Sequence, residues 1–277
     1  MNRLLCANFA RLKKDRVFWL GILFMAGYGA FIMFGNYMDS LKYGEKFYID
    51  NAFFSYAIIV GITSAVFCCL FLGTEYSEGT IRNKLMVGHT RGRIYLANLI
   101  VCTAAGLLMT LAFLITAAGI GIPLFGFFHA KPETVLAILS GTLLMVIAFT
   151  SVFTFLSMMI QNKAVAAVTV VMTVFVLLFT AIYLSSALNS PEMYEGYSYT
   201  DDDGNVVEQE AQPNPAYVSG TKRQVYEALM DILPTGQSLQ YASMSAVHLW
   251  QLPAYSVIIT IVTTGAGIIV FRKKDIK

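Results

Sequence analysis

Six long stretches of the chain contain no aspartate, glutamate, lysine, arginine or histidine. They are Val17 to Met38, Ala52 to Gly73, Ile94 to Ile120, Thr134 to Ile160, Ala164 to Leu188 and Ala254 to Phe271. Each has about 18 residues or more, which is the length that an α-helix needs to cross the hydrocarbon core of a bilayer. One such run could be a buried helix of a soluble protein, but six of them in 277 residues leave no polar shell to enclose them. The pattern therefore predicts an all-α polytopic membrane protein with six transmembrane helices.

Composition agrees with this prediction. Hydrophobic residues make up 57% of the chain and charged residues only 13%, whereas a soluble domain carries roughly 25% charged residues. The charges are concentrated between the six apolar runs, in residues 1–16, in the hairpin 74–93, in the segment 189–253 and in the tail 272–277.

The first polar segment, residues 1–16, predicts an amphipathic helix. Leu5, Phe9 and Leu12 repeat at the spacing of one helix face, and five lysines and arginines occupy other positions. We expect a helix capped by Asn2 that lies in the membrane interface, with its apolar face toward lipid and its basic side chains near anionic headgroups. The alternative is that these charges serve only to orient the first span.

The hairpin 74–93 predicts a short helix between the second and third spans. Ser77 can cap a helix that runs from Glu78 to Val87, and Gly88 can end it. Ile81 and Leu85 share one face at i, i+4. Such a helix, held by two spans, can dock its apolar knob into a cleft of a soluble partner, while an ordinary charged loop is the alternative.

Glu78 is also placed to pair with Arg82 at i, i+4. Together with Glu75 and His89 these residues form the one dense group of titratable side chains in the hairpin. We interpret the group as structural ion pairing, because a metal or acid-base site there would be open to water.

The large segment 189–253 predicts structure of its own. Asp203-Gly204 stands between strand-like flanks within Tyr197 to Gln209, a hairpin signal. The acidic residues there lack the ligand spacing of a calcium loop, so a solvated turn is preferred.

An amphipathic helix should follow the hairpin, with a capping box formed by Thr221 and Gln224 and with Pro234 as its stop. A short helix that dips into the outer leaflet would then place His248 and Trp250 at the depth of the interface.

Basic residues predict the orientation. Of the 19 lysines and arginines, 14 fall in residues 1–16, 74–93 and 272–277 and at Lys163, and five fall in the segments that alternate with these. The positive-inside rule then places both termini and the hairpin 74–93 in the cytoplasm, and the segment 189–253 outside. Nine of the 17 acidic residues lie in that external segment, and the charge pattern does not indicate nucleic-acid binding.

The apolar runs restrict the chemistry. A carrier driven by an ion gradient usually keeps carboxylate, histidine or lysine side chains inside its spans, and these runs have none. The same absence removes the residues of an intramembrane protease. Hydroxyl side chains in the runs either pack between helices or line a path for a substrate, and the candidates for such a path are Thr63, Ser64, Thr150, Ser151 and Thr154.

The chain also lacks the phosphate-binding loop G-x-x-x-x-G-K-[ST]. Any ATPase must therefore be another polypeptide, and we expect no enzyme activity in this chain. The four cysteines, Cys6, Cys68, Cys69 and Cys102, are interpreted as small packing residues and not as metal ligands or disulfides.

The hairpin resembles the signature stretch of the type-2 ABC transporter permeases, the membrane subunits of ATP-binding cassette exporters. The resemblance rests on Glu75-x-x-x-Gly79-Thr80-Ile81-Arg82, a gap of the size of a short helix, and Arg91 at the start of the third span. It extends to the order of parts: a basic N-terminal helix, six spans, a large segment between spans five and six, and the basic tail FRKKDIK. Many relatives have Pro or Ser before the arginine, where this chain has Gly88-His89-Thr90.

This resemblance implies a partnership. Two permease chains, identical or different, would form the path, and two cytoplasmic ATPase subunits would bind ATP and Mg²⁺ below them, so that this chain needs no cofactor of its own. The short helix would be the coupling helix, and the residues contacting the ATPase would be Glu75, Glu78, Gly79, Thr80, Ile81, Arg82, Lys84, Leu85 and Arg91.

The resemblance further implies export by alternating access through the bacterial cytoplasmic membrane, with an antimicrobial peptide, a drug or a lipid-linked molecule as the substrate. A resistance pump that extracts a peptide from the outer leaflet is a variant of this function. From a different class, the chain could be a membrane sensor or scaffold whose hairpin binds a signalling protein.

Overall fold

Six long helices make up the body of the protein in the computed structural model, which describes residues 1–44, 46–200 and 206–275. They are α2 (Arg16–Tyr43), α3 (Tyr56–Ser77), α5 (Arg91–Phe125), α6 (Pro132–Met159), α7 (Lys163–Leu188) and α10 (Gln251–Lys273). All six are long and apolar enough to cross a membrane, and each covers all or most of one of the predicted runs. The prediction of an all-α polytopic membrane protein is confirmed.

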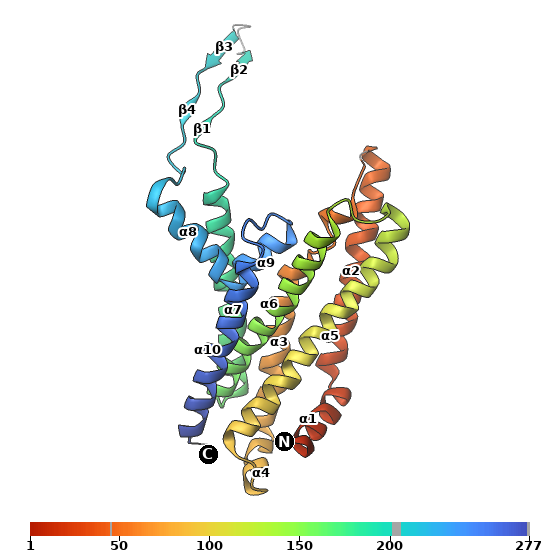
Figure 1. The fold of residues 1–277 in the computed structure, drawn as a ribbon, viewed down its shortest axis with the longest axis vertical. Coiled ribbons are helices and arrows are strands. Elements are labelled where there is room, and N and C mark those ends of the chain that lie inside the picture. The colour runs from red at the N-terminus through yellow and green to blue at the C-terminus, as the bar shows by residue number, and fades with distance from the viewer. Residues whose placement is uncertain (45, 201–205, 276–277) are drawn as a thin grey trace.

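The two ends of the bundle differ. Both termini, the helix α1 (Asn2–Lys14) and the short helix α4 (Thr80–Met86) lie together at one end, and the strands project from the other (Figure 1). We call the first end the base and the second the top. An even number of spans requires this arrangement of the termini, while the side of the membrane that each end faces stays a prediction.

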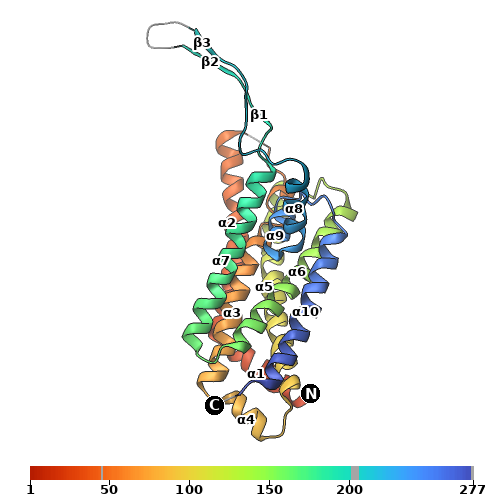
Figure 2. The ribbon, with the colours of Figure 1, turned by 90° about the vertical axis from the view of Figure 1, so that its left-hand side faces the viewer.

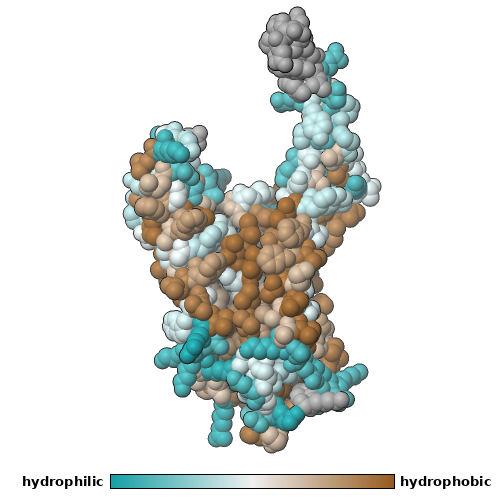
Figure 3. All heavy atoms as spheres, turned by 180° about the vertical axis from the view of Figure 1, so that it is seen from behind, coloured by the Kyte–Doolittle hydropathy of each residue, from teal (hydrophilic) through white to brown (hydrophobic). Residues whose placement is uncertain are grey.

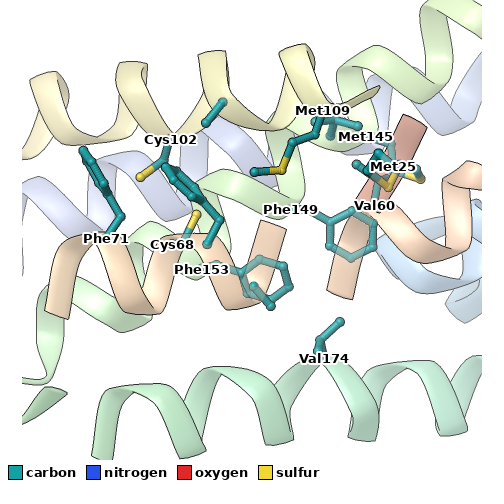
Figure 4. Close-up of a cluster of buried hydrophobic side chains, with 14 of the residues drawn as sticks. Met25, Val60, Cys68, Phe71, Cys102, Met109, Met145, Phe149, Phe153 and Val174 are labelled. Atoms are coloured by element: carbon teal, nitrogen blue, oxygen red, sulfur yellow. The ribbon is translucent and has the colours of Figure 1, made fainter. Parts of the chain in front are cut away.

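The core of the bundle surrounds α3. This helix packs against α5, α6 and α7, and Figure 4 shows Phe71, Cys102 and Phe153 from α3, α5 and α6 in that core. By contrast α2, α7 and α10 lie at the periphery and expose side chains such as Phe31, Val168 and Ile261. On the face of the bundle that Figure 3 shows, an apolar band lies between a polar base and a polar top, which is the pattern that lipid contact produces.

The top carries a long two-stranded extension (Figure 2). Strand β1 (Met193–Tyr194) pairs with β4 (Gln212–Pro213), and β2 (Tyr197–Thr200) pairs with β3 (Val206–Gln209), both antiparallel. The described strands agree with the predicted hairpin, but its expected turn at Asp203-Gly204 lies outside the described residues.

Two short helices follow the extension and differ in detail from the prediction. Helix α8 (Gly220–Ile232) has Ser219 at its N-cap, and no side-chain capping bond is formed there, so the expected capping box of Thr221 and Gln224 is wrong. Pro234 ends α8 and also opens a second helix, α9 (Pro234–Ala242), because proline is well suited to the first turn of a helix.

Helix α9 enters the bundle. The hydroxyl of Thr235 donates to the carbonyl of Leu177 at 2.8 Å, and Leu177 lies eleven residues before the end of α7, or about 16 Å along the helix. Tyr241 is fully buried. The inserted helix is therefore α9, whereas Trp250, at the start of α10, is 80% exposed.

Candidate functional site at the base of the bundle

The short helix α4 forms the lowest part of the base (Figure 1). It spans Thr80–Met86 and not the predicted range from Glu78 to Val87, because α3 continues to Ser77. The Ser77 hydroxyl donates to the carbonyl of Thr74 and does not cap α4. Gly79, at φ +67°, occupies the N-cap in a left-handed conformation that glycine adopts without strain.

Gly88 closes the helix, as predicted, although the last helical residue is Met86 and not Val87. Gly88 has φ +92°, and its backbone N–H donates to the carbonyl of Leu85 while the N–H of His89 donates to that of Lys84. These two bonds form a Schellman motif, which satisfies carbonyls that the end of the helix leaves free.

The apolar face of α4 points inward. Ile81 is only 1% exposed and belongs to the main hydrophobic core, and Leu85 is half-buried against it. The expected docking knob of Ile81 and Leu85 is therefore wrong, since these side chains cover the ends of α3 and α5. The exposed apolar residues are Met86 at 71% and Val87 at 78%, and they form the tip of the hairpin.

A buried carboxylate holds α4 in place. Glu75, in the last turns of α3, has a side chain with no exposed area. Its Oε1 accepts from the guanidinium of Arg11 and from the ammonium of Lys84, and its Oε2 accepts from the amide of Asn98 at 2.8 Å. Glu75 thus bonds to its own chain and is enclosed, although it was expected to contact a partner.

Two asparagines close this set of bonds. Asn8 donates to Asn98 at 2.7 Å and accepts from Lys84 at 2.9 Å. We call Asn8, Arg11, Glu75, Lys84 and Asn98 the Glu75 network. It connects α1, α3, α4 and α5 through bonds between residues far apart in the chain.

Burial of the charges in the network costs desolvation free energy, and removal of one charge would destabilise the others. Burial lowers the pKa of Lys84, an effect that the Glu75 carboxylate opposes and that nearby Arg11 reinforces. A buried charge is tolerated when it is paired and hydrogen-bonded, and loss of one partner leaves the other uncompensated. The Glu75 carboxylate therefore helps to hold α4 in position, together with the packing of Ile81 and Leu85.

Helix α1 contributes its buried face to the network. Leu4, Asn8 and Leu12 are buried, whereas Leu5 is half-buried and Phe9 is 39% exposed. The prediction that Leu12 faces lipid is wrong, because this face packs against the protein, including α5. Asn2 is the first helical residue and Met1 the N-cap, so the predicted Asn2 cap is also wrong.

The other hairpin residues that were predicted to contact the ATPase lie outside the Glu75 network. Glu78 and Arg82 are exposed, and among the described residues no ion pair joins them, which corrects the expected i, i+4 pair. Thr80 is half-buried. Arg91 donates to the backbone carbonyls of Arg272 and Lys274 and so holds the C-terminal tail.

Lys274 in that tail binds the base a second time. Its ammonium donates to the hydroxyl of Tyr76 at 3.2 Å and to the carbonyl of Met158, the last residue but one of α6, at 2.9 Å. Burial lowers the pKa of Lys274 to about 8. The tail therefore links α10 to the ends of α3 and α6.

The five hydroxyls predicted to line a path lie at helix contacts. Thr150 pairs with Thr103 at 3.0 Å and Ser151 with Thr263 at 2.6 Å. Ser64 and Thr154 are buried, and no hydrogen-bond partner for them is found in the described part of the chain. Thr63 bonds to its own helix and borders an apolar groove of about 420 Å³ between α2, α3 and α5. Packing within this chain explains the positions of four of these hydroxyls, and Thr63 at the groove is the exception.

The described residues contain no group of three or more histidine, cysteine, aspartate or glutamate side chains that could hold a metal ion. Cys68, Cys69 and Cys102 are buried, as packing residues should be, but Cys6 is exposed, so the interpretation of Cys6 as a packing residue is wrong.

Sequence analysis missed three members of the Glu75 network: Asn8, Arg11 and Asn98. The signal for Asn98 was present, because it is an amide within an apolar span and a buried amide requires partners. Asn8 stands between Leu4 and Leu12 on the face of α1 that is buried.

The chain matches a known protein family. The family model described as "ABC-2 family transporter protein" matches residues 4–183, which include most of α1, all of α4 and the whole Glu75 network. A search of the curated proteins found no match to the chain.

Proposed function

Because the chain belongs to the ABC-2 family of transporter proteins, the membrane subunits that work with an ABC ATPase, we propose that it is the permease of an exporter in the bacterial cytoplasmic membrane. The base would face the cytoplasm, and a second permease chain, identical or different, would complete the path. The substrate would be a peptide antibiotic, a drug or a lipid-like molecule, moved by alternating access as the partner hydrolyses ATP.

One observation carries this proposal: an exposed apolar tip stands on a helix whose other face is fixed by a buried charge. Met86 and Val87 are among the most exposed apolar side chains of the chain. They are held at the base, where the termini also lie, and exposed apolar side chains next to charged ones are typical of an interaction surface. We infer that the tip, with exposed Arg82 and Asn83 beside it, contacts the ATPase.

The Glu75 network supports a role in transmitting movement. A push on the tip acts on α4, which is bonded through Lys84 to Glu75 of α3 and to Asn8 of α1. Asn98 extends the connection to α5. Because the bonds are buried, their separation is costly, so these helices are expected to move together with α4.

The decisive experiment uses Met86→Asp and Val87→Asp in the complete chain, co-expressed with the ATPase encoded nearest to it. We expect each variant to insert in the membrane at the normal level and to lose most of the co-purifying ATPase. Phe127→Asp is the matched control, because Phe127 is 76% exposed in the loop at the top. Full ATPase retention by both tip variants would contradict the proposal.

Ile81→Asp is a poorer test. It places a carboxylate in the core, which should unfold the base whether or not the ATPase binds there. Transport by the complex distinguishes an exporter from a sensor or scaffold: vesicles should move a substrate only when ATP and both proteins are present.

A further inference from the structure

A cavity of about 350 Å³ opens at the top of the bundle, away from the Glu75 network. It lies between the end of α7, the inner face of α8, the end of α9 and the segment before α10, which are close to one another in Figures 1 and 2. Its size is in the range of sites for small ligands. Leu188, Met230 and Val247 form apolar parts of its wall, and Arg223, Glu227 and Asp231 form charged parts.

Asp231 is the most enclosed of these charges. The residue is 8% exposed, and its carboxylate accepts from the amide of Gln240 at 3.0 Å and contacts Nδ1 of His248 at 2.9 Å. Its own backbone carbonyl accepts from Gln237. The carboxylate is thus fixed at the wall of an open cavity by neighbours on α9 and on the segment before α10.

No permanently charged side chain of the described residues forms an ion pair with this carboxylate. Gln240 is neutral, and His248 carries a charge only when it is protonated. The arginine of the cavity, Arg223, pairs with Glu227 at 3.0 Å instead. A buried carboxylate without a permanent cationic partner is unfavourable, so a cation that enters the cavity would be bound by it.

The position of the cavity indicates what can carry that cation. Leu188 ends α7, a membrane-spanning helix, and α9 beside the cavity inserts into the bundle. The cavity therefore opens where lipid headgroups meet the span, and its apolar wall suits the start of an acyl chain. Arg223 uses one of its guanidinium donors on Glu227, and its remaining N–H donors can hydrogen-bond to a phosphate.

We propose that this cavity binds the primary ammonium headgroup of an aminophospholipid, with the ammonium on the Asp231 carboxylate and the chains toward Leu188 and Val247. The site goes beyond the export function proposed above and does not depend on it. A primary ammonium has three N–H donors, whereas a quaternary ammonium has none, so the cavity should distinguish phosphatidylethanolamine from phosphatidylcholine.

The test is native mass spectrometry of the purified chain incubated with an equimolar mixture of these two lipids, without ATP or ATPase. We expect the wild type to retain phosphatidylethanolamine about tenfold better, the discrimination expected for hydrogen bonds to a charged group. Asp231→Asn keeps the shape of the side chain and removes its charge, and it should bring the two lipids to near-equal retention.

Glu192→Gln is the matched control, since it removes a carboxylate from an exposed position at the top that is outside the cavity lining, and it should keep the preference. Equal retention of the two lipids by the wild type would overturn the proposal, and this measurement requires no variant. An unchanged preference for phosphatidylethanolamine in Asp231→Asn would also overturn it. The preference should also persist in Met86→Asp, so failure of the lipid site and failure of ATPase docking are separate results.

Discussion

Lys84 and Asn8 are 76 positions apart, and the ammonium of Lys84 donates a 2.9 Å hydrogen bond to the side-chain oxygen of Asn8. The short helix between spans two and three is therefore bonded to the helix that precedes span one. Since both residues also bond to Glu75 or to its partner Asn98, a displacement of α4 acts on α1 as well as on the two spans that flank it.

Removal of the Glu75 charge should destabilise the base. Glu75→Gln leaves Arg11 and Lys84, whose side chains are 24% and 11% exposed, without their anion, and loss of a partner in a buried ion pair costs about 3 kcal/mol. Thermal unfolding of the purified chain measures the loss. Glu78→Gln, at an exposed position three residues on, should change stability by about 0.5 kcal/mol or less. Equal effects of the two changes would show that the network is not a structural centre.

The two asparagines should act as a pair. Asn98→Leu leaves Glu75 and Asn8 each without one hydrogen-bond partner, at a cost of about 1 to 3 kcal/mol for each group left unsatisfied. Asn8→Leu alone removes one hydrogen-bond partner of Lys84 and one of Asn98, and both keep their bond to Glu75. In the double variant the losses should not add, and a double-mutant cycle should give a coupling energy of about 0.5 to 3 kcal/mol. Additive losses would mean that the 2.7 Å bond between them contributes nothing.

Gly267 should be required where α10 meets α5. A Cβ atom added there would lie 2.1 Å from the hydroxyl oxygen of Tyr95, which is fully buried, whereas a Cβ at Gly265 of the same helix would meet nothing within 4 Å. Gly267→Ala should therefore cost about 1 to 3 kcal/mol through overpacking. Gly265→Ala should be neutral, or stabilising by up to about 1 kcal/mol. Unfolding of both variants in one detergent provides the comparison.

The spans were predictable because a membrane imposes a length and an apolar composition that the sequence displays directly. The ends of the helices were harder to predict where charged residues follow the apolar run. Helix α2 continues to Tyr43, past Asp39 and Lys42, because a helix can extend beyond the lipid.

The site was predictable only in part. Periodicity placed Ile81 and Leu85 on one face of a helix, but it does not say whether that face meets a partner or the same chain. The Glu75 network joins residues 8, 11, 75, 84 and 98, and contacts over such separations are set by tertiary packing. The inserted helix was expected close to His248 and Trp250, whereas the helix that inserts is α9 (Pro234–Ala242), because the sequence pattern of a semi-polar segment does not show how deep it lies.

The docking of the C-terminal tail should depend on pH. Burial lowers the pKa of Lys274 to about 8, from 10.5 for a free lysine. Between these pH values the unfolded chain keeps a proton that the folded chain has lost, so stability should rise with pH from about 8 to 10.5 and be independent of this group below 8. The Lys274→Met variant has no titrating group at this position. From pH 8 to 10.5 the unfolding temperature of the wild type should therefore rise relative to that of the variant. A constant difference between the two unfolding temperatures over this range would contradict the prediction.

The orientation of the bundle can be tested with a native cysteine. Cys6 of α1 is exposed at the base, and the other three cysteines are buried. If the base is cytoplasmic, as the distribution of lysine and arginine predicts, a membrane-impermeant maleimide should leave the wild type unlabelled in intact cells and label Cys6 once the membrane is permeabilised. Phe127→Cys in a Cys6→Ser background places an exposed thiol at the top and should be labelled in intact cells. The reverse pattern would place the Glu75 network and the tip of α4 outside the cell, where no ATP-driven partner could reach them.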